Sequence, residues 1–257
     1  MPTLLVDIGN TNIKFGLAER HGLTGSFTLP TDRSATADSL GLMLVSALSF
    51  QGCPASDVET AVVSSVVPPM SQVLDQACRR YLGVRPRFVP ADVPIPLKNL
   101  YARPHEVGAD RLVTAYAGRR LATAPSVIVV DFGTATNFDC VQGDAFLGGL
   151  ICPGLATSLH GLVSKTAKLP HVALDPGDGF LSIGRSTSDC INQGFVFGFA
   201  AMVEGVTARL RAHLGGEVAV LATGGFAEKL APICPVIRDV RPELLLEGLR
   251  QLWLRRG

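Results

Sequence analysis

Two segments of this sequence repeat one pattern about 124 residues apart. The segment "LLVDIGNTNIKFGLAE" begins at Leu4, and the segment "VIVVDFGTATNFDCVQ" begins at Val127. In each, an apolar run ends in an aspartate, a short turn with glycine and threonine follows, and a second run alternates apolar residues. Two such runs around a turn of this composition predict a β-hairpin. The chain is therefore expected to build the same acidic hairpin twice.

The rest of the chain alternates between strand and helix patterns. The hairpin strands are expected at Leu4–Asp7 with Ile13–Ala18 and at Val127–Asp131 with Phe138–Val141. Further apolar runs predict strands at Ala61–Val67, Arg87–Val89, Phe146–Ile151 and Val218–Ala222. Helical periodicity predicts helices at Ser39–Ser49, Met70–Tyr81, Ala109–Thr123, Ser188–Leu214 and Glu243–Leu254, and one that opens at Phe226–Leu230.

Glycine and proline interrupt this pattern in two places. The long helix over Ser188–Leu214 contains Gly194, Gly198 and Gly205, and we expect it to break or bend there. A proline-rich connector runs from Pro90 to Pro104.

An α/β unit that begins with a hairpin and occurs twice indicates a duplicated domain with a cleft between the copies. A chain of 257 residues is long enough for two modest domains or for one large one, and the repeat favours two. We place the N-terminal domain at residues 1–122 and the C-terminal domain at residues 123–257.

The turn of each hairpin carries groups that suit a phosphate. Glycine permits close approach of the backbone, so a turn with Gly and Thr can point N–H groups and hydroxyls at phosphate oxygens. A carboxylate beside a phosphate repels it unless a divalent cation lies between them. Asp7 and Asp131 therefore suit Mg²⁺, which takes one or two carboxylates together with waters and phosphates. The alternative is an aspartate that merely stabilises its own turn, and the repetition favours the first interpretation.

Other nucleotide-binding motifs are missing from the sequence. There is no G-x-x-x-x-G-K-[ST] loop, and the single G-x-G at Gly177–Gly179 lacks the third glycine of a dinucleotide fingerprint. A third glycine-rich element, "VLATGGFAEKL", places Gly224 and Gly225 between a strand and a helix. A base and ribose could lie over so flat a turn, although an ordinary strand-to-helix turn would have the same composition.

The segment "EVGADR" precedes a helical pattern and offers a carboxylate next to a guanidinium. Asp110 could cap the helix, or it could accept the proton of an alcohol that attacks a γ-phosphate. Arg111 could bind a substrate carboxylate through two hydrogen bonds, or it could form an exposed salt bridge with Glu106.

The charge and the hydropathy argue against nucleic-acid and membrane partners, and the cysteines indicate a reducing compartment. Twenty-three basic and 22 acidic residues leave a formal charge of +1, which is not the basic footprint of a nucleic-acid-binding protein. The most apolar stretch, Phe195 to Val203, is far shorter than a membrane span. No signal peptide is expected, and six scattered cysteines indicate reduced thiols in the cytoplasm.

Together these motifs resemble a known group of enzymes. The two acidic hairpins and the late Gly-Gly turn are similar to those of actin, the heat-shock ATPases and the sugar kinases, which pair two ribonuclease-H-like domains around Mg-ATP. Within that group, "DIGNTN", "PHEVGADR", "DFGTAT", "GGLICPG" and "AKLP" resemble the type III pantothenate kinases. The resemblance covers about Leu4 to Gly225.

The resemblance implies a role for individual residues. It assigns to ATP the residues Asp7, Ile8, Gly9, Asn10, Thr11, Asn12, Ile13, Lys14 and Thr134. It assigns to pantothenate the residues Tyr101, Gly108, Ala109, Asp110, Arg111 and Thr187, with Asp110 as the proton acceptor. It assigns Asp131 to an activating potassium or ammonium ion, and it implies a homodimer in which a second subunit completes the pantothenate pocket. Asn137 departs from the family pattern, because many relatives have threonine there.

These observations lead to one hypothesis and two rivals. The hypothesis is that the chain phosphorylates pantothenate to 4′-phosphopantothenate with ATP, Mg²⁺ and a monovalent cation, which opens coenzyme A synthesis. One rival is another small-molecule kinase of the same fold. The other is a nucleotide-binding regulatory protein without metabolite kinase activity.

Overall fold

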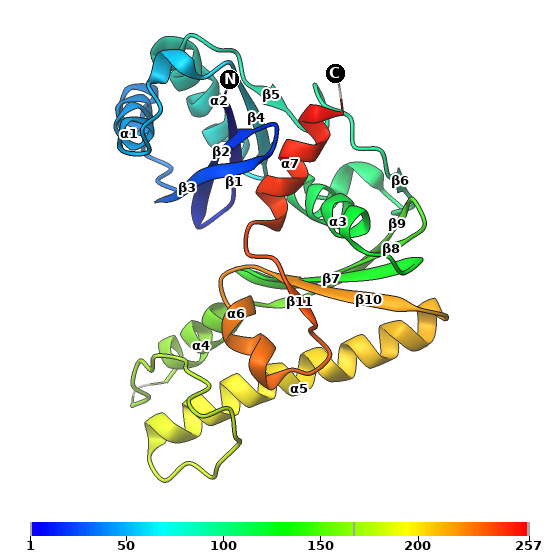
Figure 1. Cartoon of the computed structure of the whole chain (residues 1–257). Coiled ribbons are helices and arrows are strands. Elements are labelled where there is room, and N and C mark those ends of the chain that lie inside the picture. The colour runs from blue at the N-terminus through cyan, green and yellow to red at the C-terminus, as the bar shows by residue number, and fades with distance from the viewer. Residues whose placement is uncertain (1, 167, 256–257) are drawn as a thin grey trace. The chain divides into compact units, whose positions relative to one another are not determined.

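A computed structural model describes residues 2–166 and 168–255 of the chain, as an alternation of strands and helices (Figure 1). The strands are β1 (Thr3–Ile8), β2 (Asn12–Glu19), β3 (Gly22–Pro30), β4 (Thr60–Ser65), β5 (Arg87–Phe88), β6 (Lys98–Asn99), β7 (Ser126–Phe132), β8 (Ala135–Gln142), β9 (Ala145–Pro153), β10 (Val218–Thr223) and β11 (Asp239–Val240). The α-helices are α1 (Ala37–Phe50), α2 (Pro68–Ala77), α3 (Ala109–Leu121), α4 (Leu155–Ser164), α5 (Thr187–Leu214), α6 (Ala227–Leu230) and α7 (Leu244–Leu254). Short turns of other helix types are η1 (Ala55–Asp57), η2 (Cys78–Leu82), η3 (Pro104–Glu106) and η4 (Ala231–Ile233).

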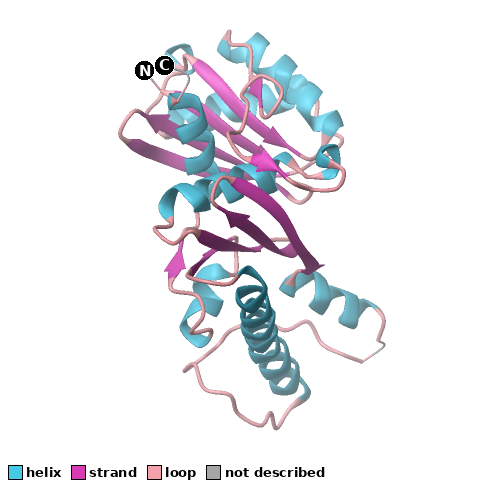
Figure 2. Ribbon diagram, turned by 90° about the vertical axis from the view of Figure 1, so that its right-hand side faces the viewer, coloured by secondary structure: helices cyan, strands magenta, loops and turns pink. Residues whose placement is uncertain are grey.

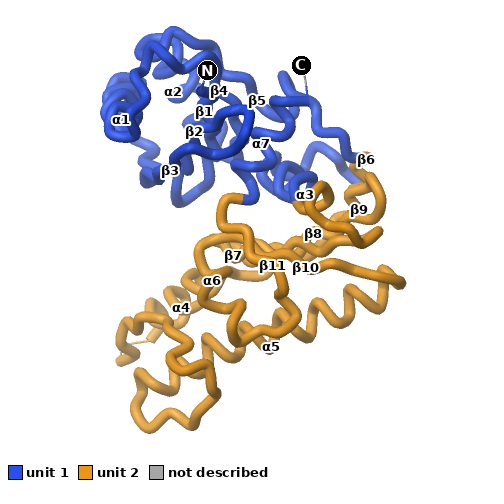
Figure 3. Tube along the Cα trace, viewed as in Figure 1, with its two compact units in different colours: residues 1–97, 102–117, 244–257 blue, residues 98–101, 118–243 orange. Residues whose placement is uncertain are grey.

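The strands form two sheets, and helices pack against each of them (Figure 2). The chain divides into two compact units (Figure 3). Unit 1 comprises Met1–Leu97, Ala102–Ala117 and Leu244–Gly257, and unit 2 comprises Lys98–Tyr101 and Gly118–Glu243. The C-terminal helix α7 therefore belongs to the same unit as the N-terminal strands. The predicted domain boundary between residues 122 and 123 stays a prediction.

Unit 1 contains a five-stranded sheet in the order β3-β2-β1-β4-β5. β1, β2 and β3 pair antiparallel, whereas β4 runs parallel to β1 and β5 runs parallel to β4. Successive side chains of a strand point to opposite faces, so both faces of β1 are buried. Leu4, Val6 and Ile8 pack with α1 and α2, and Leu5 packs with α3 and α7.

Unit 2 repeats this order and adds one strand. Its sheet has the order β11-β10-β7-β8-β9-β6, in which β7, β8 and β9 pair antiparallel and β10 and β11 continue in parallel. β7 to β11 thus correspond to β1 to β5, and the predicted duplication is confirmed by the strand orders. β6 is the addition, and it pairs in parallel with β9.

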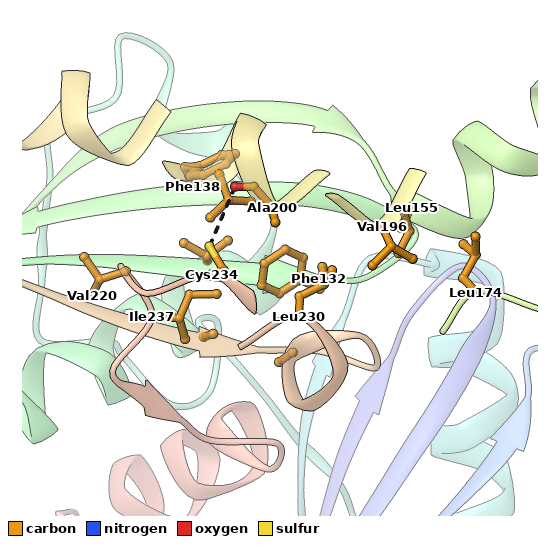
Figure 4. Close-up of a cluster of buried hydrophobic side chains, with 14 of the residues drawn as sticks. Phe132, Phe138, Leu155, Leu174, Val196, Ala200, Val220, Leu230, Cys234 and Ile237 are labelled. Carbon is orange, nitrogen blue, oxygen red and sulfur yellow. Dashed lines mark hydrogen bonds between the residues drawn. The ribbon is translucent and has the colours of Figure 1, made fainter. Parts of the chain in front are cut away.

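The core of unit 2 lies between this sheet and α4, α5 and α6. Figure 4 shows Phe132 and Phe138 from neighbouring strands in one cluster with Val196 and Ala200 of α5. The thiol of Cys234 donates a hydrogen bond of 3.7 Å to the carbonyl of Ala200 in the same cluster. Phe132 follows Asp131 directly, so this core anchors the end of β7.

The predicted helices and strands are confirmed apart from small shifts at their ends. Gly83 ends the second helical segment with φ of 70°, a left-handed conformation that glycine adopts without strain. The predicted break in the long helix is wrong, because α5 runs unbroken over 28 residues. A Cβ at Gly194 or Gly198 would meet nothing within 4 Å, so no close contact requires glycine there. Each glycine weakens a helix by only about 1 kcal/mol, and burial of one face of α5 outweighs this cost.

Three strands and one α-helix were not predicted from the sequence, namely β3, β6, β11 and α4, and neither were the short turns η1, η3 and η4. β6 and β11 have only two residues each and are strands because a neighbouring strand pairs with them. In the part of the chain that is described, none of the helices is both long and apolar enough for a membrane span.

Candidate active site

The first hairpin turn follows Asp7 at the end of β1. The N–H of Gly9 donates to the carbonyl of Asn12 at 3.0 Å, and the hydroxyl of Thr31 donates to the carbonyl of Gly9 at 2.7 Å. Ile8 and Ile13 on either side of the turn are buried in the core. The turn is thus held from both sides, while the side chains of its three central residues, Asn10, Thr11 and Asn12, are exposed.

Asp7 lies between two polar residues on neighbouring strands. The sheet register places it opposite Lys14 of β2 and Ser64 of β4. Residues at one register position of a sheet point to the same face, so a cation, a carboxylate and a hydroxyl lie side by side at this edge. This is the face that α3 covers, because Leu5 of β1 and Val62 of β4 pack there against Val113.

The segment "GADR" forms the start of α3. The N–H of Arg111 donates to the Asp110 carboxylate at 2.8 Å, so this carboxylate lies at the N-terminal end of the helix, as one interpretation predicted, and binds an N–H group of its first turn. Burial raises the pKa of the Asp110 carboxyl, and the N–H and positive charge of Arg111 oppose part of that rise. A half-buried carboxylate with a raised pKa is typical of a general base, whereas a helix cap by itself would lower the pKa.

Gly108 makes room for this carboxylate. A Cβ at Gly108 would lie 2.3 Å from Oδ1 of Asp110 and 3.1 Å from Cγ1 of Val66. The glycine of the motif is therefore explained by the side chain that folds back over it, and the same contact sets α3 against the segment after β4.

Arg111 is buried rather than exposed, with 9% of its surface accessible. Its proposed exposed salt bridge with Glu106 is wrong, because Glu106 accepts a hydrogen bond of 2.9 Å from Arg103 instead. Arg111 is thus a buried cation that follows Asp110 directly in the first turn of α3.

The contacts bring the first turn and the "GADR" segment to one edge of the unit 1 sheet. The N–H of Val66, just after β4, donates to the carbonyl of Ile8 at the end of β1 at 3.0 Å. Val66 also lies against Gly108 at the start of α3. A carboxylate with a raised pKa therefore lies near a turn suited to phosphate, on residues separated by about a hundred positions in the sequence.

The second hairpin turn, in unit 2, is held by the start of α4. The carbonyl of Thr134 accepts hydrogen bonds from the N–H of Gly154 at 3.0 Å and from the hydroxyl of Thr157 at 2.7 Å. A Cβ at Gly154 would lie 2.3 Å from the carbonyl oxygen of Gly133 and 2.5 Å from that of Thr134. The last glycine of "GGLICPG" is thus required by close packing against this turn, which the sequence did not reveal.

Asp131 lies next to the third glycine-rich element. The sheet register places Asp131 between Asn137 of β8 and Thr223 of β10. A Cβ at Gly224 would lie 2.4 Å from Oδ1 of Asp131, and Gly224 has φ of 90°. The Gly-Gly turn and the second acidic strand end are therefore parts of one site in unit 2.

The two remaining predicted residues lie on other elements of unit 2. Tyr101 follows β6, and its ring lies 6.5 Å from that of Phe146 and 3.2 Å from a Cβ built on Gly148 of β9. Thr187 is exposed and begins α5, after Ser186, whose hydroxyl caps the helix. In the "AKLP" segment, Ala167 lies outside the described residues.

The chain is similar to proteins of a known family. A family model described as "Type III pantothenate kinase" matches residues 3–209. A protein of Nitratidesulfovibrio vulgaris (strain Miyazaki F) named type III pantothenate kinase is 53% identical over 254 residues, which are 98% of this chain and 97% of that protein.

Two solved structures share the fold at low identity. A conserved Campylobacter jejuni protein, assigned in its description to the Baf family of transcriptional activators, has a TM-score of 0.61 at 20% identity, with 98% of each chain covered. A ROK family glucokinase from Streptomyces griseus, solved with glucose and AMPPNP, has a TM-score of 0.56 at 16% identity, with all of each chain covered. The predicted α/β fold of two ribonuclease-H-like domains is confirmed by these likenesses and by the repeated strand order. From the match over most of its length, this chain belongs to the type III pantothenate kinase family.

Proposed function

We propose that this chain transfers the γ-phosphate of ATP to the primary hydroxyl of pantothenate and so forms 4′-phosphopantothenate, the first step of coenzyme A synthesis. Membership of the family supports the reaction. The observation that carries it in the structure is the half-buried Asp110 carboxylate, whose pKa is raised by burial, at the start of α3 next to the segment that follows β4.

Asp110 is the proposed proton acceptor. Phosphoryl transfer to an alcohol requires that the hydroxyl lose its proton as it attacks, and a carboxylate can take it. Burial raises the pKa of Asp110, which makes the ionised carboxylate a stronger base than a solvated one. Its hydrogen bond from the N–H of Arg111 fixes the orientation of the group before the substrate arrives.

The residues of the two turns bind the phosphates in this proposal. The exposed side chains of Asn10, Thr11 and Asn12, with Lys14 opposite Asp7, belong to a turn whose backbone is already fixed by Thr31. We propose that Thr134 of the second turn also binds ATP, and that Asp7, Ile8, Gly9 and Ile13 complete the first turn as its scaffold. A fixed turn binds phosphate at a smaller entropic cost than a mobile one.

Two cations suit the carboxylates. Asp7 at the end of β1 offers the oxygen ligand that Mg²⁺ shares with phosphates and waters, and the exposed turn beside it leaves a path for them. When bound, Mg²⁺ neutralises the negative charge of the transferred phosphoryl group. The side-chain-free approach of Gly224 to Asp131 suits a potassium or ammonium ion, which prefers oxygen ligands.

The acceptor is recognised by charge. Pantothenate carries one carboxylate, and Arg111 offers a planar guanidinium that can bind a carboxylate through two hydrogen bonds. Gly108 and Ala109 bring the backbone close to the same place, and Tyr101 and Thr187 are proposed to line the pocket. Because Thr187 lies at the exposed start of α5, we propose that it acts in a homodimer, which light scattering would report as twice the 27.1 kDa of the chain.

The six cysteines support a reducing compartment. All six are free, and burial raises the pKa of both Cys78 and Cys234 to about 12, so these thiols are unreactive. We propose that the enzyme acts in the cytoplasm.

The experiment is an acceptor panel. Purified protein is incubated with Mg-ATP, potassium and one alcohol at a time, and phosphorylated products are detected by mass spectrometry. We expect 4′-phosphopantothenate from pantothenate and at most trace product from sugars. Efficient phosphorylation of another acceptor would favour the rival kinase, and ATP binding without any product would favour the regulatory rival.

A further inference from the structure

Ser64 has a buried hydroxyl that the proposed mechanism does not use. The residue is fully buried at the end of β4, and its Oγ has no hydrogen-bond partner among the residues that the structure describes. A buried hydroxyl without a partner destabilises a protein by about 1–3 kcal/mol, and such groups are rare enough that each requires an explanation.

The hydroxyl of the neighbouring residue, Ser65, does have hydrogen-bond partners. The Oγ of Ser65 accepts hydrogen bonds from the N–H of Val67 at 3.2 Å and from the hydroxyl of Ser71 at 2.7 Å. Ser65 points to the opposite face of the sheet from Ser64. At the end of β4 the unpartnered hydroxyl is therefore the one on the face on which Asp7 lies.

The sheet register places Ser64 directly beside Asp7. β1 and β4 are parallel neighbours, and Asp7 and Ser64 occupy the same register position. Neighbouring strands lie about 4.8 Å apart, which a serine hydroxyl and a carboxylate can bridge with a hydrogen bond. Asp110 faces the same side, because it lies one helical turn before Val113, which packs on that face.

The duplicated half of the molecule repeats this arrangement. Asp131 of β7 occupies the same register position as Thr223 of β10, so a hydroxyl also accompanies the second acidic strand end. There the hydroxyl has a partner, the carbonyl of Pro242 at 3.4 Å. The pairing of an acidic strand end with a hydroxyl on the parallel neighbour is thus a property of both halves, and only Ser64 is left for another partner.

We infer that Ser64 is a positioning residue for phosphoryl transfer. In the nucleotide-bound enzyme its hydroxyl donates a hydrogen bond to the carboxylate of Asp7 and fixes the direction of the oxygen that faces Mg²⁺. The inference rests on the proposed function of Asp7 and adds a residue that acts through it. Groups that orient a metal-binding carboxylate in this way typically contribute 10–100-fold to metal affinity.

The test is Ser64→Ala, followed by two measurements. The magnesium concentration that gives half-maximal phosphorylation is expected to rise by about tenfold. The rise in Tm on addition of Mg²⁺ with a non-hydrolysable ATP analogue is expected to shrink, while the Tm of the ligand-free protein stays equal or increases, because no hydrogen bond is lost.

Two variants are matched controls. Ser65→Ala removes a hydroxyl that has partners, so it should lower the Tm of the ligand-free protein and leave the magnesium requirement unchanged. Thr207→Val removes another buried hydroxyl without a partner in the described part of the chain, on α5. Like Ser64→Ala it should not lower the Tm of the ligand-free protein, but it should leave the magnesium requirement and the ligand-induced rise in Tm unchanged.

Unchanged magnesium requirement and unchanged ligand-induced stabilisation in Ser64→Ala would overturn the inference, as would a loss of ligand-free stability like that of Ser65→Ala. If wild-type protein phosphorylates no pantothenate, the proposed function fails, and the thermal-shift measurement still decides the role of Ser64.

Discussion

Burial has two opposite effects on the Asp110 carboxyl. It disfavours the charged form and so raises the pKa, which improves the carboxylate as a base. The same burial makes the ionised side chain unfavourable for the folded state. Because the folded pKa lies above the unfolded value of about 3.8, the folded protein loses stability as the pH rises between those two values.

Asp110→Asn should therefore be more stable than wild type at pH 7.5. The amide is uncharged, so the variant does not lose the stability that wild type loses when the Asp110 carboxyl ionises. Its advantage in Tm should therefore shrink as the pH falls toward 4. A change of 1 kcal/mol corresponds to about 2–4 °C in a chain of this size. Thermal unfolding from pH 4 to 8 measures the difference, and a variant that is less stable at every pH would contradict the burial argument.

At the residue scale the sequence singled out candidate site residues but did not show how the fold holds them. "GADR" stood out through its acidic and basic neighbours, but the contact of Gly108 with the Asp110 carboxylate depends on a side-chain conformation. Ser64 belongs to no motif, because its importance comes from the register of β1 and β4. The sequence around Arg111 is equally compatible with a surface residue, whereas the structure buries it.

At the scale of elements, each acidic turn is held by a neighbouring segment. Thr31, just after β3, bonds the carbonyl of Gly9, whereas Gly154 and Thr157 at the start of α4 bond the carbonyl of Thr134. These hydrogen bonds fix one backbone carbonyl group in each turn. In the proposed function, residues outside the hairpins therefore hold the phosphate-binding turns in position.

Gly154→Ala tests this support. The new methyl would overlap the carbonyl oxygens of Gly133 and Thr134 and displace the turn, so the KM for ATP should rise by about tenfold or more. Gly161→Ala, in the same helix with nothing within 4 Å of the new methyl, should leave KM unchanged and stabilise the protein by about 0.5–1 kcal/mol. Equal KM values for wild type and Gly154→Ala, with a folded variant, would show that α4 does not position the turn.

The elements with clear periodicity were predictable and the short ones were not. α4 was missed because Gly154, Gly161 and the flanking polar residues obscure its apolar face, although Leu155, Leu159 and Val163 are buried on one side. The glycines of α5 suggested a break because glycine lowers helix propensity, yet packing of Val196, Ala200 and Val203 outweighs that local cost.

At the scale of the whole molecule, the repeated hairpin was enough to predict a duplicated fold. The strand orders of the two sheets agree, because each sheet begins with an antiparallel hairpin and then continues with parallel strands beside its first strand. The return of α7 to unit 1 could not be predicted, since an amphipathic helix shows that it packs and not on which sheet. Tyr101 and Thr187 likewise carry no local signal, and only the resemblance singled them out.

The most direct test of the account is a single-turnover measurement on Asp110→Asn, with Glu106→Gln as the control. Each enzyme is loaded with Mg-ATP and mixed with pantothenate, and the formation of 4′-phosphopantothenate is followed in time. The account predicts equal ATP binding in all three proteins, a rate about 10²–10⁴-fold below wild type for Asp110→Asn, and a wild-type rate for Glu106→Gln, whose exposed carboxylate pairs only with Arg103 among the described residues. A wild-type rate for Asp110→Asn would contradict the claim that this carboxylate accepts the proton.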